Sequence, residues 1–292
     1  MQPSENDLAP DEAGTEAFFR RLAENSPIGI FLVQEGQFRF VNREFERCTG
    51  FKMRELVGRD CLSLVHPSDR AMVRAAAVEM LKAKRATPYE YRVITADRRV
   101  IWILETVTSI SYQGNRAAAG NFMNITERKS LEEKLREQAR RDSLTGLLNH
   151  GAIIDELQSL IAESADGTHA VAVGDVCSLK RLNDQYGHQA GDAVLNAVAE
   201  ALSVGGAIVG RYGGDEFVVI LPDFEWEQAT AYRESVAQTL SKAKVTDPRT
   251  GATFLVALTL GMAIYPADGG SADELIAAAD ARMYDQRRQA VA

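Results

Sequence analysis

Several features are scarce in this chain of 292 residues, and each scarcity excludes a class of protein. Basic residues do not prevail: 33 lysines and arginines stand against 41 acidic residues, so the net charge is −8. A nucleic-acid binder usually needs a cationic surface, which this composition argues against. The longest apolar run, residues 253–265, is too short to cross a bilayer, so no membrane partner is expected.

Cysteine is also scarce. The three cysteines, Cys48, Cys61 and Cys177, are scattered and lack the spacing of a metal site, which indicates a reduced, cytoplasmic protein. The N-terminal segment is acidic and polar and has none of the features of a signal peptide. We expect residues 1–14 to be a disordered tail.

The length suffices for two domains, and residues 15–128 have the pattern of the first. A strand pair, small helices and three further strands predict an α+β domain with one antiparallel sheet. We expect helices at 15–27 and 70–84, a hairpin of 28–33 and 37–41 around Glu35-Gly36, and strands at 89–95, 100–111 and 117–124.

This first domain, residues 15–128, resembles a PAS sensor domain. The resemblance rests on FVNREFERCTGFKMRELVGRD, VHPSDR, YEYRVITADRRVIWI and GNFMNITERK, which occur in family order. Asn124 departs from it, because the closing D-I-T motif usually has Asp there. The ligand of the sensor stays unknown: we interpret His66 as a loop-ordering residue rather than a haem ligand, and Cys48 does not lie in an N-C-R-F flavin motif.

Residues 125–141 are charged and contain neither Gly nor Pro, which predicts an exposed helix. Leu131 and Leu135 form a narrow apolar seam on it. The seam is consistent with coiled-coil pairing between two copies or with a solvated linker. We interpret the segment as a signalling helix between two domains.

The second domain is expected over residues 142–292. Its most informative stretch is Gly213-Gly214-Asp215-Glu216, which lies between the apolar runs 207–209 and 217–221. This pattern predicts a two-residue β-hairpin turn where glycine lets a ligand approach the backbone. Around it we expect helices at 144–163, 190–202, 225–244 and 272–288, and strands at 170–176 and 254–264.

The second domain resembles the GGDEF-domain diguanylate cyclases. DSLTGLLN, GDVCSLKRLNDQYGHQAGDAVL, RYGGDEFVVILP, LTLGMAIYP and ADARMYDQRR occur in the order of that family, over about residues 142–290. The resemblance implies a nucleotidyl-cyclase-like fold, a central mostly antiparallel sheet flanked by helices. It also implies that a homodimer condenses two GTP into cyclic di-GMP and two pyrophosphates.

The resemblance implies the metal ligands. Asp175 ends a buried apolar strand, where a carboxylate is costly unless it is paired or bound to a metal. A strand-end Asp that caps the next turn is the alternative. In the family pattern Asp175, the backbone carbonyl of Val176, and Asp215 bind Mg²⁺ or Mn²⁺. Asp215 and Glu216 then have catalytic roles, that of Glu216 a supporting one.

The same resemblance implies how the nucleotide is bound. Lys180 matches the phosphate-contacting lysine, with backbone N–H groups up to Leu179 and the close approach at Gly213 and Gly214 beside it. Arg287 stands where the family usually has a second phosphate-contacting lysine. Alone, Lys180 would be read as a surface lysine.

Guanine selection falls to Asn183 and Asp192 in the family pattern. A carboxylate can accept hydrogen bonds from both N1–H and N2–H₂ of guanine, and adenine offers no such pair of donors. Without the resemblance, Asp192 would be read as a first-turn acid stabilised by the helix dipole.

Several positions depart from the family pattern. Cys177 replaces a second Asp, Leu179 a Phe and His150 an Arg, and Ala290-Val291 replaces a Gly-Arg pair. We therefore expect weaker GTP affinity. The inhibitory R-x-x-D reads Val204-Gly205-Gly206-Ala207 here, so we expect no product inhibition through that site.

Three alternatives to the cyclase remain open. A degenerate domain would bind GTP and relay the signal without turnover, which the departures favour and the intact GGDE motif opposes. An enzyme that makes a mixed GMP–AMP product is opposed by Asp192. A pure cyclic di-GMP receptor is opposed by the missing R-x-x-D.

Overall fold

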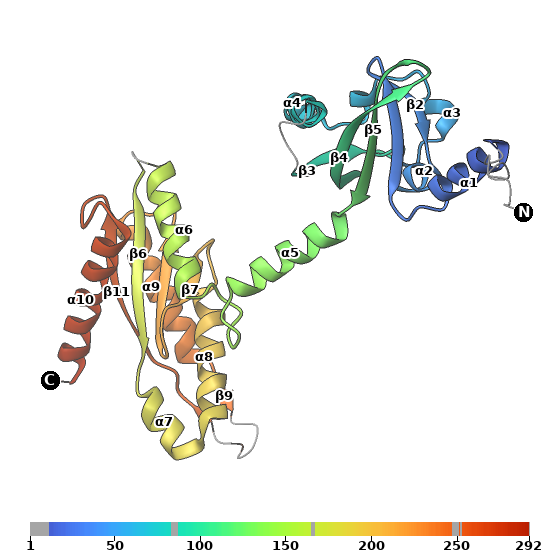
Figure 1. The fold of residues 1–292 in the computed structure, drawn as a ribbon. Coiled ribbons are helices and arrows are strands. Elements are labelled where there is room, and N and C mark those ends of the chain that lie inside the picture. Colours follow the sequence, from blue (N-terminus) through green and yellow to red (C-terminus); the bar gives the residue numbers. More distant parts are fainter. Residues whose placement is uncertain (1–11, 83–86, 165–166, 247–250, 252, 292) are drawn as a thin grey trace, which may run out of the picture. The chain divides into compact units, whose positions relative to one another are not determined.

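The computed structural model describes residues 12–82, 87–164, 167–246, 251 and 253–291 (Figure 1). Contacts between residues divide the chain into two units, Met1–Lys134 and Leu135–Ala292. Among the helices that the structure describes, none combines the length and the apolar character needed to cross a membrane. The predicted α+β class is confirmed in both units.

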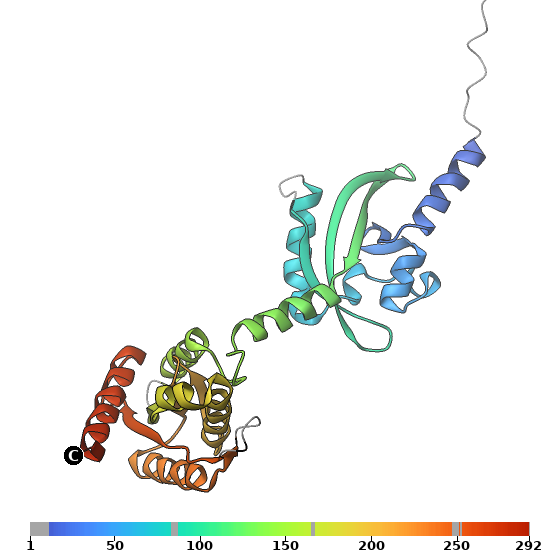
Figure 2. The same cartoon turned by 90° about the horizontal axis from the view of Figure 1, so that it is seen from below.

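The first unit is built on an antiparallel sheet of five strands in the order β2-β1-β5-β4-β3. Figure 2 shows β4 and β5 as a long curved pair with α4 beside them. The strands are β1 (Gly29–Gln34), β2 (Gln37–Val41), β3 (Tyr89–Ile94), β4 (Val100–Tyr112) and β5 (Asn115–Asn124). The helices are α1 (Glu12–Glu24), α2 (Arg43–Thr49), α3 (Met53–Leu56), α4 (Arg70–Leu81) and the 3-10 turns η1 (Cys61–Ser63) and η2 (Pro67–Asp69).

The predicted hairpin around Glu35-Gly36 is confirmed, and its turn residues have φ of 54° and 76°. Both values are typical of a primed two-residue turn. The first helix differs from the prediction: it covers 12–24 rather than 15–27. Of the predicted disordered tail, residues 1–11 lie outside the described part of the chain, and 12–14 already belong to α1.

One buried carboxyl group lies in the core of the first unit. Glu105 on β4 is 6% exposed, and its two oxygens accept hydrogen bonds from the hydroxyls of Tyr89 and Tyr91 on β3. Burial raises the pKa of Glu105 to about 7, although the two tyrosine hydrogen bonds act in the opposite direction. The Glu105 carboxyl group of the folded protein therefore stays protonated to a higher pH than the same group in an unfolded chain.

We expect the stability of the first unit to fall as pH rises from about 4.5 to 7. Over this range the unfolded chain loses the Glu105 proton while the folded chain keeps it, which costs up to about 3 kcal/mol. Glu105→Gln should flatten this decline relative to wild type. Fluorescence of Trp102 in a Trp226→Phe background would follow unfolding in urea. Parallel pH curves for the two proteins would contradict the raised pKa.

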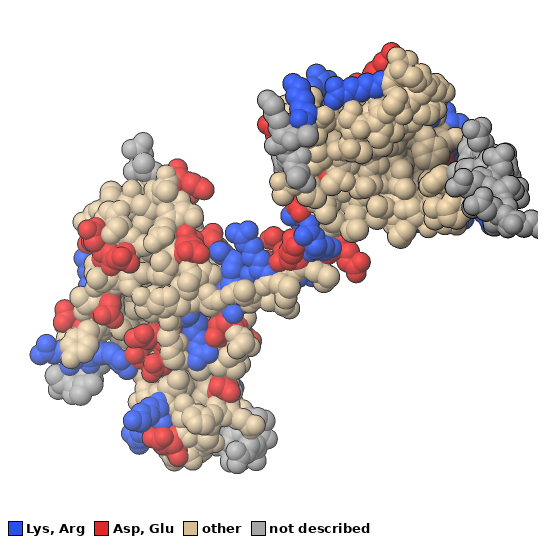
Figure 3. Space-filling view, in the orientation of Figure 1, with Lys and Arg blue, Asp and Glu red and all other residues tan. Residues whose placement is uncertain are grey.

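The segment between the two predicted domains is the helix α5 (Thr126–Ala139), where the sequence predicts one. Acidic and basic side chains are interspersed along it (Figure 3). Leu131 and Leu135 are 52% and 64% exposed, so the predicted apolar seam faces solvent in the single chain. At the start of α5 the Thr126 Oγ1 accepts a hydrogen bond from the backbone N–H of Trp102, and at its end the Ala139 carbonyl oxygen accepts one from the Asn149 side-chain amide.

The second unit contains an antiparallel sheet of four strands in the order β11-β6-β8-β7 (Figure 1). Alternate residues of each strand enter two separate cores. Helices α6 and α10 cover one face, and α7, α8 and α9 contribute to the core on the other. The strands are β6 (His169–Val176), β7 (Ile208–Arg211), β8 (Glu216–Leu221) and β11 (Leu258–Tyr265), besides the small pair β9 (Val245–Thr246) and β10 (Thr253–Phe254). The helices are α6 (His150–Glu163), α7 (Leu179–Tyr186), α8 (His188–Leu202), α9 (Trp226–Lys242) and α10 (Ala272–Val291).

Two predicted element boundaries in this unit are wrong. Helix α6 begins at His150 rather than Leu144, because Gly146 has a φ of 70° and Asp142 holds a turn before the helix. The strand expected over 254–264 is split: β10 covers 253–254, and β11 begins only at Leu258. The short helix α7 has no counterpart in the sequence prediction.

Helix α10 touches the backbone of β11 at Gly261. A Cβ atom at this position would lie 2.0 Å from the Ala279 carbonyl oxygen and 2.2 Å from the Met283 nitrogen. Only glycine permits this approach of helix to strand.

Replacing Gly261 by alanine is expected to lower the free energy of unfolding of the second unit by about 1–3 kcal/mol, since the methyl group must push α10 away. Trp226 fluorescence in a Trp102→Phe background reports on this unit. Gly270→Ala is the control, because a Cβ there lies 3.9 Å from its nearest atom. Equal urea midpoints for the two variants would rule out the close contact.

Candidate active site

Four of the predicted site residues lie together at one end of the central sheet. Asp175, near the end of β6, pairs with Glu216 at the start of β8. The Val176 N–H donates to the Asp215 carbonyl oxygen at 3.0 Å. Because partners in an antiparallel pair point to the same side, Asp175 and Glu216 share the face that α10 covers.

The charges at this end repel one another. Asp175 is only 8% exposed, and burial raises its pKa; the charge of Asp215 acts in the same direction, and Arg287 opposes it. The pKa of Glu216 is raised by burial first and then by Asp175 and Asp215. Asp280 on α10 adds a further negative charge. The folded chain thus holds acids together at a cost to its own stability.

Arg287 lies against Asp175. Its Nη2 is 2.8 Å from Oδ1 of Asp175, and this ion pair acts to lower the pKa of Asp175. Among the described residues no other donor reaches this buried oxygen. The sequence predicts Arg287 as a phosphate contact. In this structure its guanidinium instead partly neutralises the most buried acid of the group.

The carboxylate group suits a hard divalent cation. Within the part of the chain that the structure describes, no three His, Cys, Asp or Glu side chains lie close enough to hold a metal ion by themselves. Mg²⁺ is usually bound by one or two carboxylates and completes its shell with water and substrate phosphates. The raised pKa values of the buried Asp175 and of Glu216 fit a cation that arrives with a phosphate ligand.

The loop that carries the two glycines is longer than predicted. Four residues, 212–215, separate β7 from β8, and neither glycine has a positive φ, so the predicted two-residue turn is wrong. The glycines differ in their surroundings. A Cβ at Gly213 would lie 2.9 Å from Glu216 Oε2, whereas at Gly214 nothing lies within 4 Å. Gly214 thus leaves open space next to Asp215.

Arg211, which the sequence analysis missed, braces this loop. Its Nε and Nη2 donate to the Gly214 carbonyl oxygen at 3.2 and 2.7 Å, and its Nη1 donates to Asp142 at 3.2 Å. Burial alone would raise the pKa of Asp142, but hydrogen bonds from Thr145 and Arg211 outweigh it and lower the pKa. The turn that follows α5 is thereby linked to the glycine loop.

His150 contacts the same loop from the first turn of α6. Its ring stacks on Tyr212 with centroids 4.0 Å apart, and its Nδ1 lies 3.0 Å from the Tyr212 carbonyl oxygen. The sequence singled out His150 only as a departure from the family pattern. Its position beside the loop could not be read from local sequence, because 62 residues separate the partners.

The predicted phosphate-binding residues lie at the start of α7, immediately after β6. Ser178 has a φ of 61°, which turns the chain into the helix. Lys180 is exposed, whereas the Leu179 side chain is buried in the core, so only the backbone of Leu179 can face a ligand. Cys177 is half-buried, and its Sγ lies 3.4 Å from Thr259 Oγ1 on β11.

Asn183 and Asp192, the predicted guanine contacts, lie on α7 and α8. The Asn183 Oδ1 is buried without a hydrogen-bond partner and reaches over Gly191, where a Cβ would lie 1.9 Å from it. Gly191 precedes Asp192 directly. An unpaired buried amide oxygen next to a half-buried carboxylate leaves polar groups that a bound base could satisfy.

Comparison with known proteins assigns both units to families. The family model described as "Diguanylate cyclase, GGDEF domain" matches residues 139–291. This chain belongs to the GGDEF family. A "PAS fold" model matches residues 38–119, so both predicted resemblances are confirmed.

Two curated relatives match most of this chain. An "Uncharacterized signaling protein" of Caulobacter vibrioides is 30% identical over 91% of this chain and 33% of its own length. Diguanylate cyclase VdcA of Vibrio cholerae is 30% identical over 67% of this chain and 58% of its own. This chain thus spans about a third to three fifths of the length of these relatives.

A solved structure has the same fold as the GGDEF unit. The crystal structure of the coiled coil and GGDEF domain of DgcB from Caulobacter crescentus in complex with c-di-GMP is 28% identical, with a TM-score of 0.53. The matched region covers 56% of this chain and 89% of the DgcB chain.

The segment 204–207 of the GGDEF unit forms a tight turn between α8 and β7. The Ala207 N–H donates to the Val204 carbonyl oxygen at 3.2 Å, and Gly205 and Gly206 have φ of 66° and 80°. None of its side chains carries a charge.

We expect Arg211 and Asp142 to be coupled in stability. Arg211→Met and Asp142→Asn, made singly and together, should give a coupling energy of about 1 kcal/mol, since both side chains are mostly buried. Urea unfolding followed by Trp226 fluorescence in a Trp102→Phe background measures it. Arg211→Met combined with Asp273→Asn, an acid on α10, is the control and should be additive. An additive result for Arg211 with Asp142 would mean that the ion pair does not brace the loop.

Proposed function

We propose that this chain is an active diguanylate cyclase that condenses two GTP into cyclic di-GMP and two pyrophosphates. The single observation that carries the proposal is the group of mutually repelling acids around the buried Asp175. A fold that holds such charges together favours a site that needs them over a purely structural role.

The predicted site residues have separate roles in binding the cation and the phosphates. Asp175, Asp215 and the Val176 carbonyl would hold Mg²⁺ or Mn²⁺, which when bound supplies positive charge against the phosphates. Lys180 and the backbone N–H groups at the start of α7 bind phosphate oxygens, and the space at Gly214 admits them. Glu216 supports this group of acids.

Two further contacts complete nucleotide binding. Asn183 and Asp192 accept hydrogen bonds from the guanine edge, which an adenine would leave unsatisfied. Once a cation offsets the charge of Asp175, Arg287 is free to leave it and contact a phosphate. The ion pair in the ligand-free chain is therefore compatible with the phosphate contact that the sequence predicts.

The reaction requires two copies of the chain. The 3′-hydroxyl of each GTP attacks the α-phosphorus of the other, so each attack forms one phosphodiester bond and releases one pyrophosphate. Each GGDEF unit holds one GTP, and a homodimer must bring the two together. The exposed Leu131 and Leu135 on α5 offer an apolar seam for pairing.

We further propose that the PAS unit regulates this dimer through α5 in the cytoplasm, without nucleic-acid or membrane partners. The bracing of the glycine loop through Arg211 and Asp142 supports this, because Asp142 follows α5 closely. The absence of charged side chains in the 204–207 turn supports an enzyme without product inhibition through this segment.

A non-catalytic GTP-binding relay is the second candidate. Cys177 favours it, because a thiol that contacts Thr259 stands where the family pattern has another acid. The replacement of the Gly-Arg pair by Ala290-Val291 favours it as well.

Incubation of the full chain with GTP and Mg²⁺ should yield cyclic di-GMP on chromatography, and EDTA should abolish it. Asp175→Asn and Asp215→Asn should each lower the rate by at least about a hundredfold, because each removes a cation ligand. Glu163→Gln, an exposed acid at the end of α6, is the matched control. With an equimolar ATP/GTP mixture the product should contain guanine alone.

Thermal unfolding separates the two candidates. GTP with Mg²⁺ should raise the midpoint of the wild-type chain through binding. A raised midpoint without product would favour the relay. Unchanged turnover in Asp175→Asn would overturn the assignment of the site.

A further inference from the structure

A large cavity lies inside the PAS unit, well away in sequence from the GGDEF motifs. Its volume is about 890 Å³, within the range of sites for small organic ligands. It extends from the sheet strands to η1 and α4, and most of the side chains that line it are apolar.

One wall of the cavity is aromatic. Phe31, Phe38, Phe45 and Phe122 pack edge to face, with centroids of neighbouring rings 4.7 to 6.1 Å apart. Aromatic edges carry partial positive charge and attract the electron-rich face of another ring. This wall therefore favours a flat aromatic guest.

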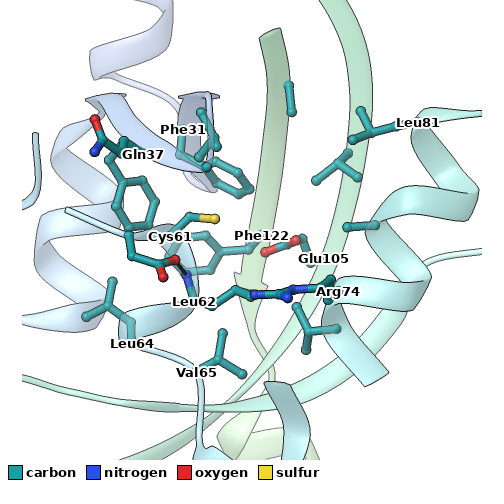
Figure 4. Close-up of a pocket in the computed structure, with 18 of the residues that line it drawn as sticks. Phe31, Gln37, Cys61, Leu62, Leu64, Val65, Arg74, Leu81, Glu105 and Phe122 are labelled. Atoms are coloured by element: carbon teal, nitrogen blue, oxygen red, sulfur yellow. Dashed lines mark hydrogen bonds between the residues drawn. The ribbon is translucent and has the colours of Figure 1, made fainter. Parts of the chain in front are cut away.

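Among the described residues that line the cavity, Glu105 is the buried acid, and its carboxyl group points into this apolar space. Figure 4 shows Glu105 with its oxygens directed toward the middle of the cavity, beside Phe122 and Cys61. Each oxygen accepts one tyrosine hydrogen bond and keeps further acceptor capacity. Arg74 lines the same cavity, and among the described residues no ion pair joins it to Glu105.

We propose that this cavity binds a small aromatic heterocycle whose ring N–H donates a hydrogen bond to Glu105. The ring of the ligand packs against the phenylalanine wall, and its N–H group donates a hydrogen bond to a Glu105 side-chain oxygen. A haem bound through His66 fits less well, because that histidine is not among the described residues that line the cavity. The proposal concerns ligand binding alone and does not depend on cyclase activity.

Indole and benzofuran are suitable probes, because they share one shape and only indole has an N–H. Calorimetric titration of the full chain, without GTP, should give an indole affinity at least about tenfold above that for benzofuran. Glu105→Leu should abolish this preference while benzofuran still binds. Glu105→Gln should reduce it, and Glu79→Gln, an exposed acid on α4, should preserve it.

The proposal would be overturned by binding of neither probe to wild type, by equal affinity for both, or by an unchanged preference in Glu105→Leu. If Glu105→Leu binds neither probe, Glu105→Gln decides. A reduced preference in Glu105→Gln supports the carboxylate as the acceptor, and an unchanged one refutes it.

Discussion

The repulsion among Asp175, Asp215 and Glu216 is the constraint around which the second unit is organised. The strands β6 and β8 bring these acids together because their pairing places Asp175 opposite Glu216. Burial adds to the cost, since it raises the pKa of both groups. The two cores beneath supply the stability that offsets this cost, and Arg287 supplies the nearest positive charge.

Much of this fold could be predicted from the sequence. The apolar run of β6 and the Glu35-Gly36 turn are local patterns, and the structure has both. The glycine loop was misread because glycine predicts a positive φ, whereas Gly213 and Gly214 serve here to leave space. Helix α7 was missed because its eight residues make only about two turns, and short segments are hard to assign from a periodic pattern.

The candidate site was predictable as a set of motifs but not as an arrangement. Motif order identified Asp175 and Asp215, yet the brace formed by Arg211 joins positions 69 residues apart. Glu105 was missed as well. Alternation with Ile101, Ile103 and Val107 puts it on the buried side of β4, but its tyrosine partners lie on another strand, so the hydrogen bonds that hold it could not be read from local sequence.

The close contact of α10 with Gly261 fixes the position of this helix against β11. Met283 touches the glycine, and Arg287 follows four residues later, about one turn further along the helix. The contact with β11 therefore determines the direction in which the Arg287 side chain leaves α10. A single residue inserted between these two positions would swing Arg287 by about 100° around the helix axis. The helix could remain well packed while its ion pair with Asp175 was lost.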